Sequence, residues 1–264
     1  MRKLSVSLKD YSTIKIGGTA DLVIYPETLE EFCEAADEFY TAPIVGGGSN
    51  IFFADSNYPA IICTKKLKLV EEYVDGSINA WCGVLLGDLF AIGAGVPATI
   101  GGAVLMNFGA YGKEIQEYLV SVDVYDREKR QATTILRSEI HFGYRTSSFQ
   151  NKHRQVILSA RFLCRDLENK PEWLAKRKVA MPYEYPNIGS IFRNPEGQSA
   201  GKLLDTVGAK TFAVGDARVS EKHANIIVNA GRATAEDMQQ LIQLMQSTVK
   251  AKTGIELKTE VECL

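Results

Sequence analysis

Apolar residues recur at helical spacing in several stretches of the chain. In residues 26–40 the apolar residues at this spacing are Leu29, Phe32, Cys33 and Ala36. Thr28 and Glu31 have the spacing of an N-terminal capping box. A second helix is predicted over 200–206. A third, longer helix is predicted to begin after Thr234 and to stop at Gly254. Its buried face is expected to consist of Met238, Leu241, Ile242, Met245 and Val249.

Short apolar and β-branched runs predict strands between these helices. The predicted strands are 21–25, 42–45, 60–64, 67–74, 78–82, 119–126, 155–165, 225–229 and 255–263. The strand, helix and strand of the first 45 residues form a β-α-β unit, whose connection is normally right-handed. Helices and strands occur in both halves of the chain, which predicts an α+β or mixed α/β architecture.

The segment 166–186 is polar and charged and contains three prolines, so it is the best predicted domain boundary. A length of 264 residues also favours two domains over one. We therefore expect one domain over 1–166 and a smaller one over 167–264, with a terminal strand able to pack back on the first.

Composition and charge narrow the class of protein. The chain is 45% hydrophobic and 23% charged, which is typical of a soluble globular protein with a sizeable core. Lys plus Arg is 30 against 32 for Asp plus Glu, a near-balance that argues against a dedicated nucleic-acid or anionic-membrane binder. No apolar run has membrane-spanning length and the N-terminus has no apolar signal segment, so the expected location is the cytoplasm.

Cysteine and histidine usage points the same way. The five cysteines are odd in number and contain no C-x-x-C pair, which predicts free thiols in a reducing compartment. His141, His153 and His223 have no spacing that would hold zinc. No metal-dependent mechanism is expected.

Glycine is concentrated in the first 112 residues, which hold 14 of the 22. In V-G-G-G-S-N-I (45–51) a strand leads into three glycines, whose backbone N–H groups would suit a pyrophosphate. The G-K-[ST] ending of a P-loop is missing. A tight turn between core elements is an equally good interpretation of the three glycines alone.

The second glycine-rich segment is G-A-G-V-P-A-T-I-G-G-A (93–103). It formally contains the dinucleotide-binding pattern G-x-G-x-x-A, but the preceding L-L-G-D-L-F-A-I is not a clear strand, so the match is weak. Thr99, Gly101 and Gly102 offer further donors. The two segments together suit one long ligand such as a dinucleotide.

Three later segments carry reactive side chains. Arg145 lies among aromatics and hydroxyls, Ser190 precedes Arg193 and Asn194, and Glu260 lies in an apolar stretch. Each alone is typical of a surface arginine, a turn serine or an exposed carboxylate. No base is placed in the sequence to make Ser190 part of a nucleophilic triad. A cation and a hydroxyl would instead suit a reaction that forms and protonates an enolate.

Eight motifs follow one another along nearly the whole chain. They are S-T-I-K-I-G-G (12–18), V-G-G-G-S-N (45–50), G-V-P-A-T-I-G-G-A (95–103), N-F-G-A-Y-G (107–112), F-G-Y-R-T-S-S-F (142–149), P-N-I-G-S-I-F-R-N-P (186–195), S-A-G-K-L-L-D-T-V-G (199–208) and V-S-E-K-H-A-N-I-I-V-N (219–229). In this order they resemble the UDP-N-acetylenolpyruvoylglucosamine reductase family, in its compact subclass.

The resemblance implies an α+β fold with an FAD-binding domain of the vanillyl-alcohol-oxidase type and a smaller substrate-binding domain. It implies FAD and NADPH as cofactors, a UDP-sugar enolpyruvyl ether as substrate, a role in peptidoglycan synthesis, and no obligatory protein partner. The residues it implies for FAD are Gly46, Gly47, Gly48, Ser49, Asn50, Gly95, Thr99, Gly101, Gly102 and Ala103.

The resemblance also implies catalytic roles. Arg145 and Glu260 would stabilise an enolate-like intermediate, and Ser190 would deliver the final proton. The implied substrate contacts are Tyr144, Arg177, Arg193 and Asn194.

The chain departs from the family pattern beside the second glycine segment. Ala98 stands where the family usually has glycine, and the stretch between Phe90 and Gly93 is shorter than usual. Two alternatives stay open: another flavin oxidoreductase of the same superfamily, and a nucleotide-sugar-binding relative without catalysis. The motifs around Ser190 and Glu260 argue against the first, because they belong to the substrate-binding part.

Overall fold

The computed structural model describes residues 1–150 and 154–264, so His153 lies outside the described residues. Contacts divide the chain into two units that are discontinuous in sequence. Unit 1 consists of Met1–Val6, Ala20–Gly47 and Pro59–Ala175, and unit 2 of Ser7–Thr19, Gly48–Tyr58 and Lys176–Leu264. The functional division at residues 166 and 167 stays a prediction.

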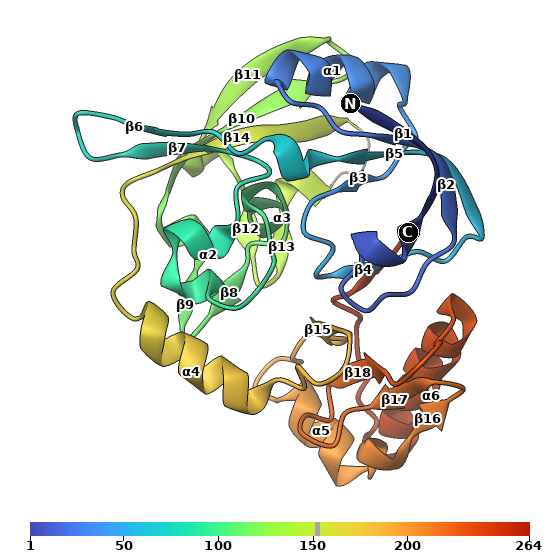
Figure 1. Ribbon diagram of the computed structural model, residues 1–264. Coiled ribbons are helices and arrows are strands. Elements are labelled where there is room, and N and C mark those ends of the chain that lie inside the picture. The colour runs from blue at the N-terminus through green and yellow to red at the C-terminus, as the bar shows by residue number, and fades with distance from the viewer. Residues whose placement is uncertain (151–153) are drawn as a thin grey trace. The chain divides into compact units, whose positions relative to one another are not determined.

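A five-stranded antiparallel sheet is the larger sheet of unit 1 (Figure 1), with strand order β11-β10-β14-β7-β6. Its strands are β6 (Val70–Glu72), β7 (Ile78–Trp81), β10 (Leu119–Asp126), β11 (Gln131–Leu136) and β14 (Gln155–Phe162). Four of these coincide with predicted strands, although β6 is much shorter than 67–74 and β14 ends before 165. β11 was not predicted from the sequence.

A second sheet in unit 1 has the order β1-β2-β5-β3. Its strands are β1 (Arg2–Ser7), β2 (Thr19–Ile24), β3 (Ile44–Val45) and β5 (Asn57–Cys63). The predicted strand–helix–strand order is confirmed by β2, α1 (Leu29–Glu38) and β3. β5 lies between β2 and β3 and pairs in parallel with β3.

The start of α1 follows the predicted capping signal. The Thr28 hydroxyl accepts the N–H of Glu31 at 3.2 Å, as an N-cap residue does. The Glu31 carboxylate accepts the N–H of Glu27 at 2.8 Å instead of the N–H of Thr28. The reciprocal bond of the capping box therefore falls one residue before the cap.

Three further helices occupy segments for which no helix was predicted. They are α2 (Leu86–Leu89), α3 (Ile100–Leu105) and α4 (Lys170–Ala180). α4 lies inside the predicted boundary segment 166–186. Pro171 is its second residue and is tolerated there, because N–H groups of the first helical turn have no partner within the helix.

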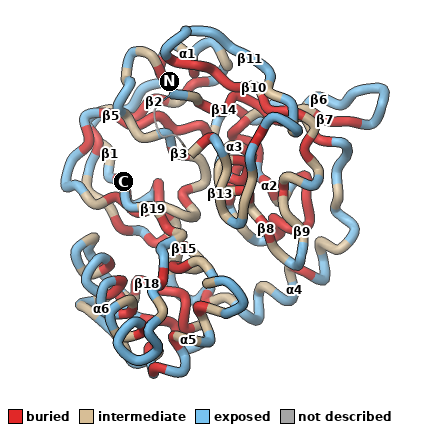
Figure 2. Tube along the Cα trace, turned by 180° about the vertical axis from the view of Figure 1, so that it is seen from behind, coloured by how far each residue is buried: buried red, intermediate tan, exposed pale blue. Residues whose placement is uncertain are grey.

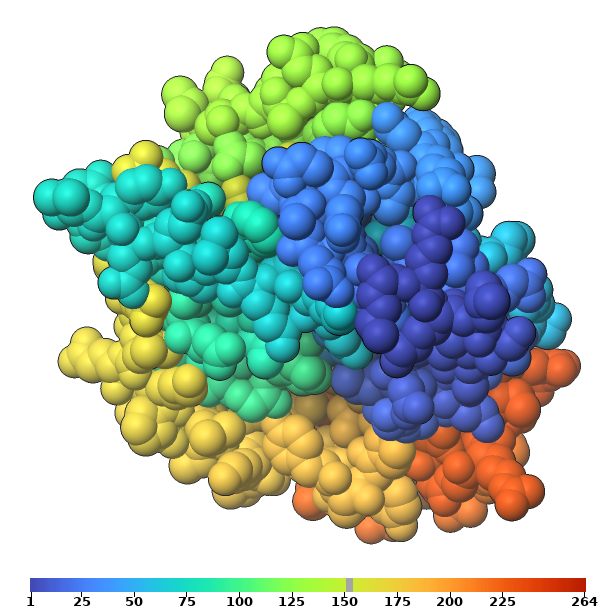
Figure 3. Space-filling model, turned by 45° about the horizontal axis from the view of Figure 1, so that its top comes forward, coloured from blue at the N-terminus to red at the C-terminus, as the bar shows by residue number. Residues whose placement is uncertain are grey.

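The core of unit 1 collects α3 and the inward residues of both sheets, shown as buried in Figure 2. By contrast, the turn between β6 and β7 is exposed and projects from the face shown in Figure 3. Val74 lies in this turn with its side chain in solvent, and Gly76 adopts φ +81°. The turn explains why β6 ends at Glu72.

Unit 2 is built on a four-stranded antiparallel sheet of order β15-β18-β17-β16. Its strands are β15 (Asn187–Ser190), β16 (Ala213–Val214), β17 (Ala217–Val219) and β18 (Ile226–Asn229). The predicted helices are confirmed as α5 (Ala200–Thr206) and α6 (Ala235–Thr253). Thr234 caps α6, Gly254 ends it at φ +75°, and the five residues predicted for its buried face are the buried ones.

The predicted strand 255–263 is wrong over most of its length. Only β19 (Glu262–Cys263) is a strand, and it pairs in parallel with β4 (Ile51–Phe52) of the same unit. The preceding residues form only an isolated bridge between Thr259 and Phe192. The N–H groups of Glu260 and Val261 then both point to the same carbonyl, Ile191 O, which interrupts a regular ladder. Alternating apolar residues alone do not fix a single strand partner.

None of the helices in residues 1–150 and 154–264 is both long and apolar enough to cross a bilayer. Within those residues, no three His, Cys, Asp or Glu side chains gather closely enough to hold a metal ion.

Candidate active site

The two glycine-rich segments are neighbours in unit 1. A Cβ on Gly47 would lie 1.5 Å from the carbonyl oxygen of Pro97, and one on Gly46 would lie 2.2 Å from Thr99 Oγ1. Both distances are far inside van der Waals contact, so only glycine fits at these positions. The two segments predicted to hold one ligand thus approach each other through their backbones.

The remainder of the first segment belongs to unit 2. Gly48 adopts φ +71°, where a Cβ would meet the Tyr11 carbonyl, and its own carbonyl accepts Thr13 N–H at 2.9 Å. Ser49 is half-buried. Asn50 donates from Nδ2 to the backbone oxygen of Glu260 at 3.0 Å. The Asn50 side chain therefore helps to position Glu260, a candidate catalytic residue. This role is separate from any contact of the Asn50 backbone with a cofactor.

In the second segment, Thr99 is buried and is the N-cap residue of α3, while a Cβ on Gly102 would lie at ordinary van der Waals distance, 3.7 Å, from Thr99 Oγ1. Gly101 lies tightly against Cys82, and Gly95 is exposed at φ +74°. Ala103 is a core residue whose N–H donates to Thr99 O and whose carbonyl accepts Phe108 N–H.

The shortened stretch after α2 is fastened to the chain that follows β14. Asp166 N–H donates to Leu89 O at 3.0 Å, and Ala91 N–H donates to Asp166 O at 2.6 Å. The Asp166 carboxylate binds Lys113 at 3.0 Å and the Tyr118 hydroxyl at 2.8 Å. These two bonds hold the pKa of Asp166 below its usual value, while burial and Asp166 raise the pKa of Tyr118 to about 12. Ala98, the other departure, packs into the unit 1 core.

Arg145 lies in the turn of a small hairpin formed by β12 (Phe142–Gly143) and β13 (Thr146–Ser147). Its backbone adopts φ +56°, which is uncommon for a residue with a side chain. Its guanidinium lies 5.7 Å from the ring centre of Phe108 and 5.4 Å from that of Tyr144, which is itself largely exposed. A Cβ on Gly109 would come within 3.2 Å of Arg145 Nη1.

A buried asparagine supports this hairpin. Asn107 is fully buried at φ +42° and donates from Nδ2 to Glu114 Oε2 and to Gly143 O, both at 2.9 Å. Gly143 is two residues before Arg145. Asn107 is therefore part of what places the guanidinium within unit 1.

Ser190 is the last residue of β15, opposite Ile226 of β18. The register of this pairing is irregular between Asn187 and Ser190, and Gly189 there adopts φ +75°. A side chain would be strained at this φ. The glycine permits the irregularity that sets the backbone at Ser190.

The segment of Glu260 lies directly beside the strand of Ser190. Glu260 N–H donates to Ile191 O at 2.8 Å, and Arg193 N–H donates to Lys258 O at 2.9 Å. Phe192 and Thr259 form an antiparallel bridge between these two bonds. Ser190, Arg193 and Glu260, predicted from segments about 70 residues apart, therefore share one part of unit 2.

The other substrate candidates differ in their placement. Asn194 is exposed, and its Oδ1 accepts Ala200 N–H at 3.0 Å at the start of α5. Arg177 lies in the last turn of α4, outside the strand and the terminal segment that carry Ser190 and Glu260. Arg145 and Tyr144 belong to unit 1.

Sequence reasoning missed the two buried asparagines that organise these segments, Asn107 and Asn225. Both lie inside motifs that were noticed, N-F-G-A-Y-G and V-S-E-K-H-A-N-I-I-V-N. The signal that could have singled them out is an amide residue inside an otherwise apolar run, because a buried amide needs partners.

Comparison with known proteins agrees with this arrangement. The model of the UDP-N-acetylenolpyruvoylglucosamine reductase C-terminal domain matches residues 181–264. The reductase of that name from Desulforamulus reducens is 34% identical over 99% of this chain and 93% of its own length. The one from Carboxydothermus hydrogenoformans is 37% identical over 97% of this chain and 92% of its own.

A crystal structure of UDP-N-acetylenolpyruvylglucosamine reductase from Thermus caldophilus covers 100% of this chain and 98% of its own, with a TM-score of 0.77 and 31% identity. The fold is accordingly that of an α+β oxidoreductase with an FAD-binding domain and a smaller domain. Within that class, the chain belongs to the UDP-N-acetylenolpyruvoylglucosamine reductase family.

Proposed function

We propose that this chain reduces UDP-N-acetylenolpyruvoylglucosamine to UDP-N-acetylmuramate with NADPH as reductant, as a step of peptidoglycan precursor synthesis in the cytoplasm. The observation that carries the proposal is the bond from Glu260 N–H to Ile191 O. It joins the segment of Glu260 to the strand of Ser190 and Arg193, the residues that the family motif assigns to the substrate. Membership of the family supports the same reaction.

FAD is the proposed cofactor of the first domain, taken as 1–166, with the substrate held by 167–264. The close approach of Gly46 and Gly47 to Thr99 and Pro97 supports it, because it brings the two glycine segments together, so that backbone N–H groups of both could contact one pyrophosphate. A flavin held there would supply hydride chemistry toward the methylene carbon of the enolpyruvyl group, with NADPH as the source of the electron pair.

The chain's own residues are proposed to stabilise the negative charge that forms and to donate the final proton. Hydride addition to one carbon of the double bond leaves negative charge on the adjacent carbon and its carboxylate. Arg145 and Glu260 are proposed to stabilise that enolate-like charge, and Ser190 to donate its hydroxyl proton to the adjacent carbon, which completes the single bond.

Substrate binding is assigned to Tyr144, Arg177, Arg193 and Asn194. The strongest support concerns Arg193, whose Nε is buried and has no hydrogen-bond partner within residues 1–150 and 154–264. A buried donor of this kind needs an acceptor. An anionic group of the substrate, a carboxylate or the diphosphate, would supply it.

The Ser190→Ala variant tests the proposal. We expect bleaching of bound flavin by NADPH to keep its wild-type rate, because Ser190 does not act in that step. Reoxidation by the enolpyruvyl substrate should slow by about 100-fold or more, the usual contribution of a general acid. Stopped-flow absorbance of the flavin measures each step separately.

Ser199→Ala is the matched control. Ser199 is a second serine of unit 2 whose hydroxyl accepts Lys202 N–H as the N-cap of α5. Its loss should lower stability slightly and leave both steps intact. Equal slowing of both steps in Ser190→Ala would refute the proton-donor role, and protein that stays colourless after incubation with FAD would refute the flavoenzyme.

A further inference from the structure

The extended stretch that follows Ser190, residues 191–193, is held by a side chain instead of a complete sheet ladder. Phe192 is buried, so its N–H and C=O both need partners. The side-chain amide of Asn225 supplies them, because Phe192 N–H donates to Asn225 Oδ1 at 3.0 Å and Asn225 Nδ2 donates to Phe192 O at 2.8 Å. A carboxamide carries the same donor and acceptor pair as a peptide group.

The backbone of Asn225 adds a third bond to the same stretch. Ile191 N–H donates to the carbonyl of Asn225 at 2.9 Å. Asn225 directly precedes β18, where the pairing with β15 is irregular. Its backbone and side chain together hold residues 191 and 192, which follow the last paired residue of β15.

The opposite edge of this stretch carries Glu260. Ile191 O accepts Glu260 N–H, and Arg193 N–H donates to Lys258 O. Residues 191–193 thus lie between Asn225 on one edge and 258–260 on the other. One buried side chain fixes the backbone to which Ser190, Arg193 and Glu260 are all attached.

We propose that Asn225 is the positioning residue of this site: it does not touch the substrate, and it holds Ser190, Arg193 and Glu260 in the geometry needed to protonate the reduced substrate. The inference rests on the proposed function. A positioning residue of this kind affects the step in which the proton is delivered and leaves flavin reduction by NADPH unaffected. A shift of about 1 Å in a reacting group lowers rates by up to about 100-fold.

Asn229, the last residue of β18, provides a matched control. It is also buried, and it makes three side-chain bonds to backbone groups: from Nδ2 to Ile14 O at 3.1 Å, and to Oδ1 from Gly231 N–H at 3.1 Å and Ala233 N–H at 3.0 Å. None of these partners lies in 190–193 or 258–261. We call the two hydrogen bonds between the Asn225 side chain and the Phe192 backbone the Asn225 clamp. Asn229→Ala tests the loss of a buried asparagine from β18 without loss of this clamp.

The experiment compares Asn225→Ala, Asn225→Asp and Asn229→Ala in the flavin-loaded protein. We expect NADPH to bleach the flavin at the wild-type rate in all three. Reoxidation by the enolpyruvyl substrate should slow by about 10- to 100-fold in Asn225→Ala, less in Asn225→Asp, and by less than about 2-fold in Asn229→Ala. The aspartate keeps the acceptor for Phe192 N–H and loses the donor to Phe192 O, so it serves if the alanine variant fails to fold.

Amide hydrogen exchange gives a readout that needs no substrate. In Asn225→Ala and Asn225→Asp, the amides of Phe192 and Glu260 should exchange faster than in wild type, and those of β17 should not. Unchanged exchange, a wild-type reoxidation rate in both Asn225 variants, or equal slowing in Asn229→Ala would overturn the inference. A wild-type protein without reductase activity would refute the proposed function instead. The exchange experiment would still test whether Asn225 holds the backbone of Phe192 and Glu260.

Discussion

At the scale of single residues, His223 lies next to the Asn225 clamp, and its own hydrogen bond fixes its protonation state. Its Nδ1 accepts the N–H of Asn225 at 3.2 Å, so this nitrogen must be unprotonated in the folded protein. Burial, together with the charge of Lys210, lowers the pKa of His223. The unfolded chain therefore takes up the proton more readily than the folded chain does.

The sign of the pH dependence follows from this difference. The folded state keeps its full stability above the unfolded pKa of about 6.5 and loses stability as the pH falls towards the lowered folded pKa. We expect the thermal midpoint to drop between about pH 7.5 and about pH 5.5. His223→Asn, which keeps an acceptor near Nδ1 and cannot titrate, should drop less.

The exposed His141 is the control for this measurement. His141→Asn should follow the wild-type curve across the same range. Parallel curves for wild type and His223→Asn would mean that other groups set the pH dependence.

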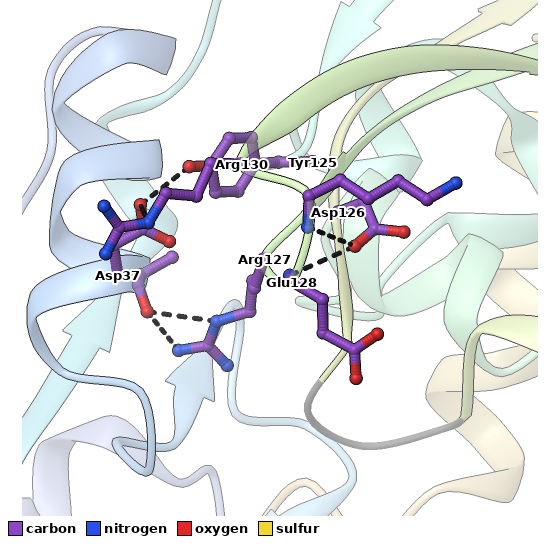
Figure 4. A network of polar contacts seen from close by, with 8 residues as sticks. Asp37, Tyr125, Asp126, Arg127, Glu128 and Arg130 are labelled. Atoms are coloured by element: carbon purple, nitrogen blue, oxygen red, sulfur yellow. Dashed lines mark hydrogen bonds and ion pairs between the residues drawn. The ribbon is translucent and has the colours of Figure 1, made fainter.

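At the scale of elements, the end of α1 depends on a residue that follows β10. The helix has no glycine at its C-terminus and no basic residue in its last turn. Arg127, which is buried and lies beside α1 in Figure 4, donates from Nε to Ala36 O at 3.0 Å. It also donates from Nη2 to Phe39 O at 3.4 Å, and its guanidinium lies 4.2 Å from the ring centre of Tyr40. These bonds satisfy carbonyls that the helix itself leaves open.

Arg127→Met keeps most of the buried stem and removes this cap. We expect it to lower the free energy of unfolding by about 2 kcal/mol, the scale of hydrogen bonds made by a charged group, as measured by urea unfolding. Arg130→Met is the neighbouring control, because Arg130 is exposed and pairs with Asp37 at 3.5 Å. Its cost should stay below about 1 kcal/mol. Similar costs for the two variants would contradict the capping role of Arg127.

Local signals explain which elements the sequence predicts. α6 has a capping box, an apolar face and a terminal glycine within its own residues, so its bounds and its buried face were predictable. β1 and β11 are edge strands that are almost entirely exposed; only Leu4 and Val6 alternate with polar residues in β1, and β11 has no apolar alternation. α4 is hidden in a polar segment with prolines. The terminal segment alternates apolar and polar residues and still forms only β19, because its partners are distant in the chain.

Some features of the candidate site could likewise be predicted from local sequence, and others could not. Glycine contacts such as Gly47 with Pro97 follow from recognisable glycine clusters, and Ser190 and Glu260 from motifs. The clamp of Asn225 on Phe192 joins residues 33 positions apart, and nothing local in the sequence marks that pair. Side-chain bonds to distant backbone are therefore the part of the site that only the structure supplies.

At the scale of the whole molecule, the two units do not follow a single cut in the sequence. Unit 2 takes Ser7–Thr19 and Gly48–Tyr58 from the first quarter of the chain. Ile14, Ile16 and Phe52 from these segments are at most 1% exposed and lie in the core of unit 2. The strand β4 from the same part of the chain pairs with β19.

A fragment of residues 167–264 therefore lacks part of its own core. Removal of one large buried side chain costs about 3–5 kcal/mol, and the fragment lacks three buried side chains and the partner of β19, which together exceed the margin of a domain of this size. We expect the isolated fragment to show poor amide dispersion by NMR and no cooperative thermal transition, whereas the intact chain shows both. A fragment that melts cooperatively with dispersed amides would mean that 7–19 and 48–58 are dispensable to this core, and the division at residues 166 and 167 would then describe a domain able to fold alone.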